Sequence, residues 1–363
     1  MLGRSSLFTL SALGMVFASL GVHAHTTQAS GNNLFVTVPD LRPGFEMSVT
    51  ALALKPGASN LNYVIYNKAL PAQSPAWEER EIKPGFGPAF DLGVRFIFPE
   101  GKDVSLDWMH LNTSDSTSIA TPNFEYFLGP DYEIGPSGIP IRNATGNSQF
   151  KYDVINLDAG QFVDFGPHTE FRFFGGLSNT YLKEQVHARF SGNTLTGQYQ
   201  GPFSTKQMVT ANFTGIGPRF GMEGRYHTDS GFGFIGKAAM SALIGYSHAK
   251  TDYVSNAQQL LDVFGQDLNY QTIEDKRVRQ VIPGFDAKLG LYYKHQLNNC
   301  YIFSIEGGYM GAVYVNAIQQ YLPASLVAGQ PLESGGIFVA TMSHTQSNYS
   351  VQGPYLGATL QFA

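Results

Sequence analysis

The chain has 363 residues, of which 43% are apolar and only 14% are charged, whereas an ordinary soluble domain carries roughly a quarter charged residues. Its mean hydropathy is −0.11, so the apolar residues must alternate with polar ones rather than gather in long runs. A net charge of −5 provides no basic excess to neutralise a phosphate backbone, which argues against nucleic acid as a partner.

The N-terminus has the pattern of a secretory signal peptide. Arg4 precedes a largely apolar run from Leu7 to Leu20, and Val22-His23-Ala24 follows where a signal peptidase would cleave. The run is too short to span a bilayer, which argues against a membrane anchor, and a buried first helix is the alternative. The expected organisation is a cleaved signal peptide at 1–24, a periplasmic segment at 25–44 and one domain at 45–363.

Period-two alternation of apolar and polar residues dominates the mature chain and predicts β-strands. Pairs of such strands are joined by short turns at 99–102, 166–168, 228–230 and 297–299. Longer, weakly patterned segments lie between the hairpins, at 55–86, 112–149, 181–206, 250–283 and 317–347. With an opening strand at 45–54 and a closing one at 348–362, we count about ten strands, with a range of eight to twelve. Short turns at one end and long loops at the other are typical of an all-β, transmembrane, antiparallel up-and-down β-barrel with extracellular loops and periplasmic turns.

A sheet in lipid must close on itself, because lipid offers no hydrogen bonds to its edges. One face of each strand then meets lipid and the other meets the lumen. Strand parity is tightly specified, because an Arg or Lys on the lipid face costs roughly 2–4 kcal/mol near the midplane. The inward positions are our candidate lumen-lining residues: Asp91, Arg95, Asp103, Asp107, Asp158, Glu170, Arg172, Lys237, Asp286, Lys288, Lys294 and Glu306. Such mixed charge fits a modestly selective pore, and it also fits a salt-bridged plug.

Two features interrupt the strand pattern. At Gly215-Ile216-Gly217-Pro218 the apolar parity switches from odd to even positions, which predicts a β-bulge that restores the register. Ala257, Leu260, Leu261 and Phe264 have helical spacing, and 314–321 is a weaker helical candidate. Either segment could fold over the barrel mouth as a helix, although loops packed on their neighbours are the simpler interpretation.

Catalytic and cofactor signatures are missing from the sequence. The run Gly231 to Gly236 matches G-x-G-x-x-G, but it lies in a predicted strand with no helix after it, so it fails the structural test for a dinucleotide site. The histidines show no metal-ligand spacing, and no nucleophile elbow occurs. His110 with Asp115 is the only hint of a hydrolase at the barrel rim. We therefore expect no enzyme and no cofactor.

The C-terminal segment resembles the signal read by the barrel-assembly machinery. It has Tyr355 and Gly357 followed by alternating hydrophobic residues, Leu360 and Phe362, and departs from the usual pattern by the trailing Ala363.

Three longer motifs resemble the Legionella pore-forming major outer-membrane protein family. They are the run IKPGFGPAFDLGVRF from Ile82 to Phe96, the run LDWMHL from Leu106 to Leu111, and the run NLDAGQ from Asn156 to Gln161. The resemblance covers nearly all of the mature chain and implies a surface-exposed barrel of porin type. Disulfide-linked members of that family carry several cysteines, whereas Cys300 is alone here, so covalent oligomers are not expected.

The expected function is passive diffusion of small hydrophilic solutes or ions across the bacterial outer membrane. The alternative is a plugged surface barrel that acts through its loops, as an adhesin or structural protein. The expected partners are outer-membrane lipids and lipopolysaccharide, the assembly machinery and the solutes themselves. A homo-oligomer and contacts with a host-cell surface are further expectations.

Overall fold

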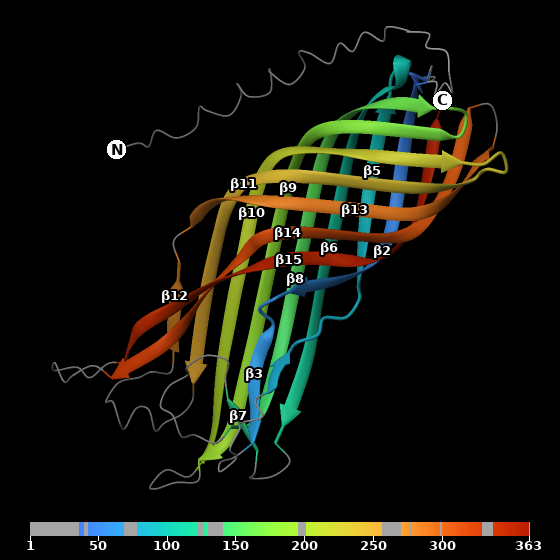
Figure 1. Ribbon diagram of the computed structural model, residues 1–363. Helices are drawn as coiled ribbons and strands as arrows, with labels where there is room; N and C mark the ends of the chain where they lie inside the picture. Colours follow the sequence, from blue (N-terminus) through green and yellow to red (C-terminus); the bar gives the residue numbers. More distant parts are fainter. Residues whose placement is uncertain are drawn as a thin grey trace, which may run out of the picture. The chain divides into compact units, whose positions relative to one another are not determined.

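The protein is a closed ring of antiparallel strands in the computed structural model, which describes residues 36–39, 43–68, 78–121, 126–129, 141–194, 201–255, 270–275, 277–297, 300–328 and 337–362. Within these residues ten long strands form the ring (Figure 1). They are β2 (Gly44–Ala58), β5 (Gly87–Ile97), β6 (Lys102–Ala120), β8 (Ile141–Phe165), β9 (Thr169–Thr194), β10 (Gly201–His227), β11 (Phe232–Ser255), β13 (Val278–Gln296), β14 (Tyr301–Ala328) and β15 (Ile337–Phe362). The fold class expected from the sequence is confirmed.

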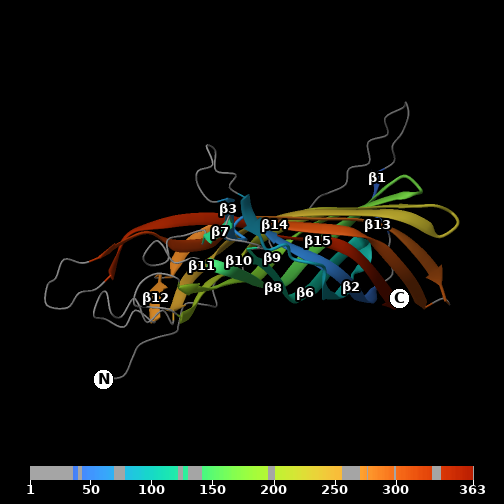
Figure 2. The same cartoon turned by 90° about the horizontal axis from the view of Figure 1, so that it is seen from below.

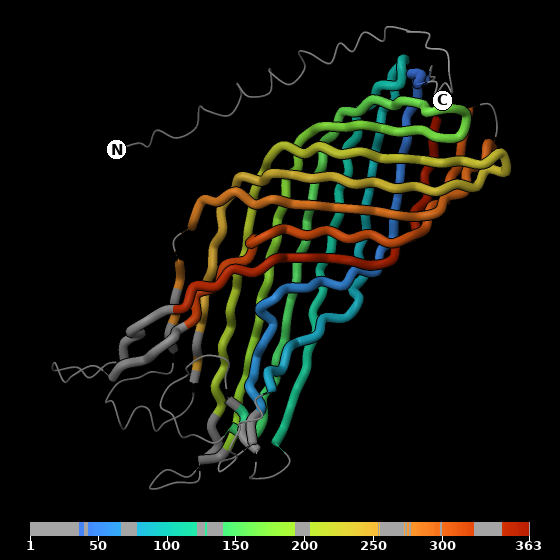
Figure 3. The backbone as a smooth tube through the Cα atoms, viewed as in Figure 1, coloured from blue at the N-terminus to red at the C-terminus, as the bar shows by residue number. Residues whose placement is uncertain are grey.

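Each long strand pairs with its neighbours along the chain, and β15 closes the ring onto β2. Following the paired residues once around the ring, from Phe45 through Ala159 and Phe285, leads back to β2 at Gly57, twelve residues farther along. This stagger requires strongly tilted strands, and the tilt is plain in the backbone trace (Figure 3).

Four short hairpin turns gather at one end of the ring, the end where the C-terminus lies (Figure 1). They connect β5 to β6, β8 to β9, β10 to β11 and β13 to β14, as the sequence predicts. The β5–β6 turn is one 3₁₀ turn, Pro99–Gly101, in which Glu100 and Gly101 have positive φ. No helix among the described residues is long and apolar enough to cross a membrane.

The strands extend much farther from the hairpin turns than the sequence pattern indicates. Much of 112–149, 181–206 and 250–283, which we expect to be loop, is strand in β6, β8, β9, β10, β11 and β13. Short strands add to the sheet: β3 (Asn62–Lys68), β4 (Glu78–Glu81), β7 (Tyr126–Gly129) and β12 (Tyr270–Glu274) at the far end, and β1 (Val36–Thr37) beside the end of β8. In Figure 2 the wall of β13 and β14 lies opposite that of β6 and β8.

The hydrophobic pattern inverts along the long strands, which explains why the sequence pattern underestimates their length. Near the hairpins the outward side chains are apolar and exposed, as for Phe220 and Tyr226 on β10. We call this zone the membrane band; it spans about 9–11 residues per strand, enough for a tilted strand to cross. Farther out, which we call the outer extension, the same face is polar, as for Lys183 and Arg189 on β9, and the inward face is apolar.

The predicted bulge at Gly215–Pro218 is wrong. β10 pairs with both neighbours in unbroken register through these residues. Phe213 points inward and is fully buried, whereas Ile216 points outward and is 55% exposed. The apolar parity switches because the strand leaves the membrane band, and an apolar interior then replaces the apolar exterior.

Segment 314–321 is strand in β14, not helix. A register shift occurs between Tyr314 and Ile318, with Asn316 at φ 55°, and the next four residues, 317–320, are all buried. The expected signal peptide, the helical candidate at 257–264 and Ala363 lie outside the described residues.

Candidate functional site: the barrel interior

The twelve candidate lumen residues lie on the inner faces of strands within the membrane band. Asp91 and Arg95 come from β5, Asp103 and Asp107 from β6, Asp158 from β8, Glu170 and Arg172 from β9, Lys237 from β11, Asp286, Lys288 and Lys294 from β13, and Glu306 from β14. Converging from seven strands, they make the hairpin half of the interior a charged zone.

Asp103 is the centre of one ion-pair network. Its fully buried carboxylate accepts from Arg172 Nε at 2.6 Å, and Arg95 Nε lies 3.2 Å away. Arg95 also faces Glu46 Oε1 at 3.3 Å and reaches across the lumen to Glu223 Oε2 at 3.6 Å. This network ties β2, β5, β6, β9 and β10 together.

Arg219 on β10 is the centre of a second cluster. It pairs with Asp158 and donates to both oxygens of Asp286, at 2.9 and 3.1 Å. The ring of Phe174 lies within cation–π range of Arg172, Arg219 and Lys237, with the cations 4.9–5.4 Å from its centroid. The Phe174 ring thus contacts three positively charged side chains. Arg219, Glu223 and Arg225, which the same parity rule counts among the inward charges, also lie on the inner face of β10.

Water reaches this charged zone. The side chains of Asp286, Lys288 and Arg225 are 34%, 27% and 30% exposed, although all three point into the ring. Several atoms of the zone, among them Asp158 Oδ1 and Arg172 Nη1, have no hydrogen-bond partner in the described protein. A buried polar group left unpaired costs about 1–3 kcal/mol, so these atoms lower the net stability that the ion pairs contribute.

An aromatic layer crosses the interior above the charged zone. Tyr152 on β8 and Tyr314 on β14 lie five strands apart around the ring in either direction, yet their hydroxyls are 3.1 Å from each other. Tyr349 stacks on Tyr152 at 6.2 Å and donates to the Lys151 carbonyl at 3.0 Å. Phe150 packs edge-on against Tyr349. All four rings are at most 5% exposed, so this layer separates the two halves of the interior.

A polar cluster lies beyond the aromatic layer, in the outer extension. Glu184, 1% exposed, accepts at Oε1 from Asn60 Nδ2 at 2.9 Å and from Gln320 Nε2 at 3.2 Å. Ser347 donates to Asn60 at 3.0 Å. Burial raises the pKa of Glu184 from 4.5 to about 8, and the two amide donors only partly offset this. The carboxyl group is therefore largely protonated at neutral pH. The sequence pattern misses this cluster because it assigns 181–206 to a loop.

His110 and Asp115, the one hint of a hydrolase, do not meet. The two residues have opposite parity on β6, so His110 points outward and Asp115 inward. The imidazole Nδ1 lies 2.6 Å from Asp153 Oδ1 on the outer wall instead.

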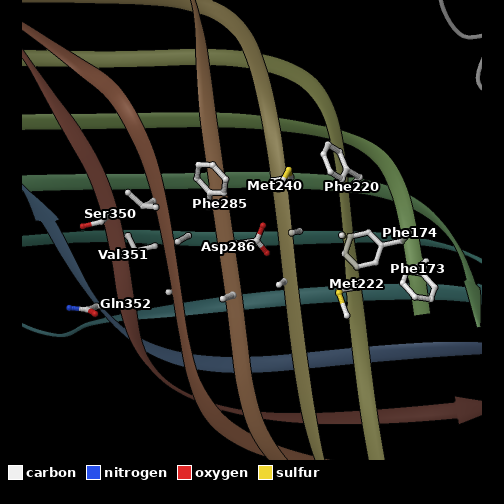
Figure 4. A pocket seen from close by; sticks show the side chains of 17 residues that line it. Phe173, Phe174, Phe220, Met222, Met240, Phe285, Asp286, Ser350, Val351 and Gln352 are labelled. Atoms are coloured by element: carbon white, nitrogen blue, oxygen red, sulfur yellow. The ribbon is translucent and has the colours of Figure 1, made fainter. Parts of the chain in front are cut away.

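A groove of about 950 Å³ crosses the wall from β9 to β15 (Figure 4). Mostly outward-facing side chains line it, among them Phe220, Met240 and Phe285, with Ala238 and Ala287 at its floor. It belongs to the lipid-facing surface and not to the interior.

The residues of the expected assembly signal divide between the two faces of β15. Tyr355 points inward and donates to Glu306 Oε1 at 2.5 Å, and Gly357 is also inward. Leu360 and Phe362 have the outward parity, and Phe362 packs against Tyr301 at 5.4 Å and Phe45 at 6.4 Å.

Comparison with known proteins identifies the family. The family model described as Legionella pneumophila major outer membrane protein precursor matches residues 37–362. The chain belongs to this family. The resemblance of the sequence motifs is thus confirmed, and the protein is an outer-membrane β-barrel. The search of curated proteins found no match.

Several solved structures are similar at low identity. The outer membrane protease OmpT from Escherichia coli is 8% identical, with a TM-score of 0.37, over 90% of this chain and 99% of that one. A Pseudomonas aeruginosa FadL homologue is 9% identical, with a TM-score of 0.23, over 88% and 90%. The Pseudomonas putida toluene transporter TodX is 7% identical, with a TM-score of 0.25, over 87% and 89%.

Proposed function

We propose that the protein is a narrow, gated pore of the outer membrane for small hydrophilic solutes or ions. The observation that carries this proposal is the partial exposure of inward-facing charges, Asp286, Lys288 and Arg225, within the membrane band, where the outer face of the ring is apolar. Lipid covers the outer face, so the water that contacts these charges occupies the lumen. A polar, hydrated lumen lined by mixed charges is what a modestly selective channel needs.

The gate in this proposal is the aromatic layer. Ten strands make a narrow barrel, in which side chains can fill much of the lumen. Tyr152 and Tyr314 meet across it, so a conducting state requires these rings to separate. Separation costs the hydrogen bond, about 0.5–1.5 kcal/mol, together with the packing of rings that are now buried against one another.

Single-channel conductance in a planar bilayer at high KCl tests the proposal. The refolded protein should give reproducible conductance steps that a mock preparation lacks. Tyr314→Ala should raise the open probability or the step size, because it removes the ring that meets Tyr152. Tyr246→Ala is the matched control, since Tyr246 is 56% exposed on the outer face, and should conduct like the wild type. A folded barrel that stays silent, and stays silent with Tyr314→Ala, would contradict the pore.

The closure of the aromatic layer favours a second candidate function, a plugged barrel that acts through its outer extension in adhesion or as a structural element. The ion pairs of Asp103 and Arg219 would then serve stability alone. Silent conductance together with binding of labelled cells or surface molecules to the outer extension would support this alternative.

Catalysis is not part of the proposal. His110→Ala should leave every hydrolase assay unchanged.

A further inference from the structure

A partly enclosed cavity of about 320 Å³ lies inside the outer extension, beyond the aromatic layer. β9, β10, β14 and β15 form its walls, together with the start of β3 and the turn that precedes it. Amide and hydroxyl side chains make up its polar lining, among them Asn60, Asn62, Gln207, Gln320, Gln346 and Ser347. Its volume falls within the range of small-molecule sites.

Gln207 on β10 is the residue of this lining that most clearly indicates a ligand. It is 3% exposed, and neither its Nε2 nor its Oε1 has a hydrogen-bond partner in the described protein. Most buried polar side chains in proteins have a partner, and each exception needs an explanation. Beneath the cavity, Glu184 Oε2 is likewise buried and unpartnered. Gln207 thus brings a complete side-chain amide with unused donors and acceptors to the wall of the cavity, where rotation of the side chain is needed to expose them to a ligand.

No charged side chain lines the cavity among the residues described. Glu184, which Asn60 and Gln320 bind from above, is largely protonated at neutral pH because burial raises its pKa to about 8. A charged ligand would therefore lose its hydration without gaining an ion pair, which is unfavourable in a partly enclosed site.

Apart from the hydroxyls of Ser59 and Thr345, the remaining lining is apolar and includes an aromatic ring. Tyr63, Val186 and Val209 face the cavity, and each is at most 7% exposed. Amides offer both donors and acceptors, as hydroxyl groups do, so they suit a ligand with many hydroxyls. The apolar wall suits a ligand whose carbon skeleton presents a C–H face.

We propose that this cavity binds a small, uncharged, hydroxyl-rich molecule of the monosaccharide class, with Gln207 as its principal hydrogen-bonding residue. Binding here requires no passage through the aromatic layer, so the inference stands or falls independently of the pore.

Saturation-transfer NMR on the refolded full chain tests this, in amine-oxide micelles whose headgroup contains no sugar. Glucose is the probe, and gluconate, which has the same carbon chain with a carboxylate, is the charged comparison. We expect saturable binding of glucose and at least ten-fold weaker binding of gluconate.

Gln207→Leu should weaken glucose binding about ten-fold, the effect of removing one buried hydrogen-bonding group. Gln185→Leu is the matched control, because Gln185 lies on the outer face of β9 and donates to Thr210 Oγ1 at 3.0 Å; its binding should be unchanged. If Gln207→Leu does not fold, Gln346→Leu, at an exposed lining position, should show a several-fold loss. No saturable glucose binding by the wild type, equal binding of gluconate, or equal losses in target and control variants would each overturn the proposal.

Discussion

Glu184 should make the stability of the barrel depend on pH, and Glu184→Gln should remove that dependence. The carboxyl group is 1% exposed, and its pKa rises from 4.5 to about 8 on burial. Below pH 4.5 both the folded and the unfolded chain carry the proton, so the group favours neither state. Between pH 4.5 and 8 the unfolded chain has released the proton and the folded chain has kept it. The free energy of unfolding therefore falls as pH rises through this window, by about 1.4 kcal/mol per unit and at most about 5 kcal/mol in total.

Urea unfolding in lipid vesicles at pH 5, 7 and 9, followed by tryptophan fluorescence, measures this effect. The neutral amide of Glu184→Gln keeps the acceptor for Asn60 and Gln320 and does not titrate. We expect the variant to exceed the wild type in stability by less than about 1 kcal/mol at pH 5 and by several kcal/mol at pH 9. Glu100→Gln, in the β5–β6 turn with a 75% exposed side chain, should follow the wild type throughout. If Glu184→Gln shows the same pH dependence as the wild type, the assignment of a protonated Glu184 is wrong.

Three further substitutions test the interior and the C-terminal strand. Arg219→Met leaves Asp158 and Asp286 without their shared guanidinium and should lower the free energy of urea unfolding by about 3–5 kcal/mol, whereas a loss below about 1 kcal/mol would show that the pairing is unimportant. Gly160→Ala places a methyl group against the Asp103 carboxylate and 2.7 Å from Arg172 Nε and should cost about 1–3 kcal/mol, while Gly175→Ala, with its nearest atom at 3.8 Å, should be neutral in the same assay. Phe362→Ser should reduce the heat-modifiable folded band recovered from the outer membrane, since it removes the contacts with Phe45 and Tyr301; Ala358→Ser on the same face should not, and equal yields would argue against an assembly role.

Much of the membrane band could be predicted from the sequence, because lipid imposes a strict rule there. Outward positions must be apolar, and they alternate with inward positions. Leu92 and Phe96 therefore identify the lipid face of β5 and place Asp91 and Arg95 inside. The hairpin turns and the approximate strand number follow from the same alternation. The twelve candidate residues therefore needed no knowledge of which strands are neighbours.

The strands of the outer extension could not be predicted from this alternation, because no lipid constrains their outer face. Polar residues such as Lys183 and Gln185 replace the outward apolar row, and the hydropathy pattern then looks like a loop. The inversion at Ile216 looked like a bulge for the same reason.

Only the tertiary structure decides which inward side chains meet. Alternation places Tyr152 and Tyr314 on inner faces, but their contact depends on ring closure, on the stagger of twelve residues and on the bulge at Asn316. The pairing of Arg95 with Glu223 and the burial of Glu184 depend on strands that are distant in the chain. The sequence alone determines a barrel with a polar lumen in the membrane, because solvent on either side of a strand dictates its pattern. The division of that lumen into a hydrated charged zone, an aromatic layer and an uncharged outer cavity arises from packing across the ring, which no local pattern records.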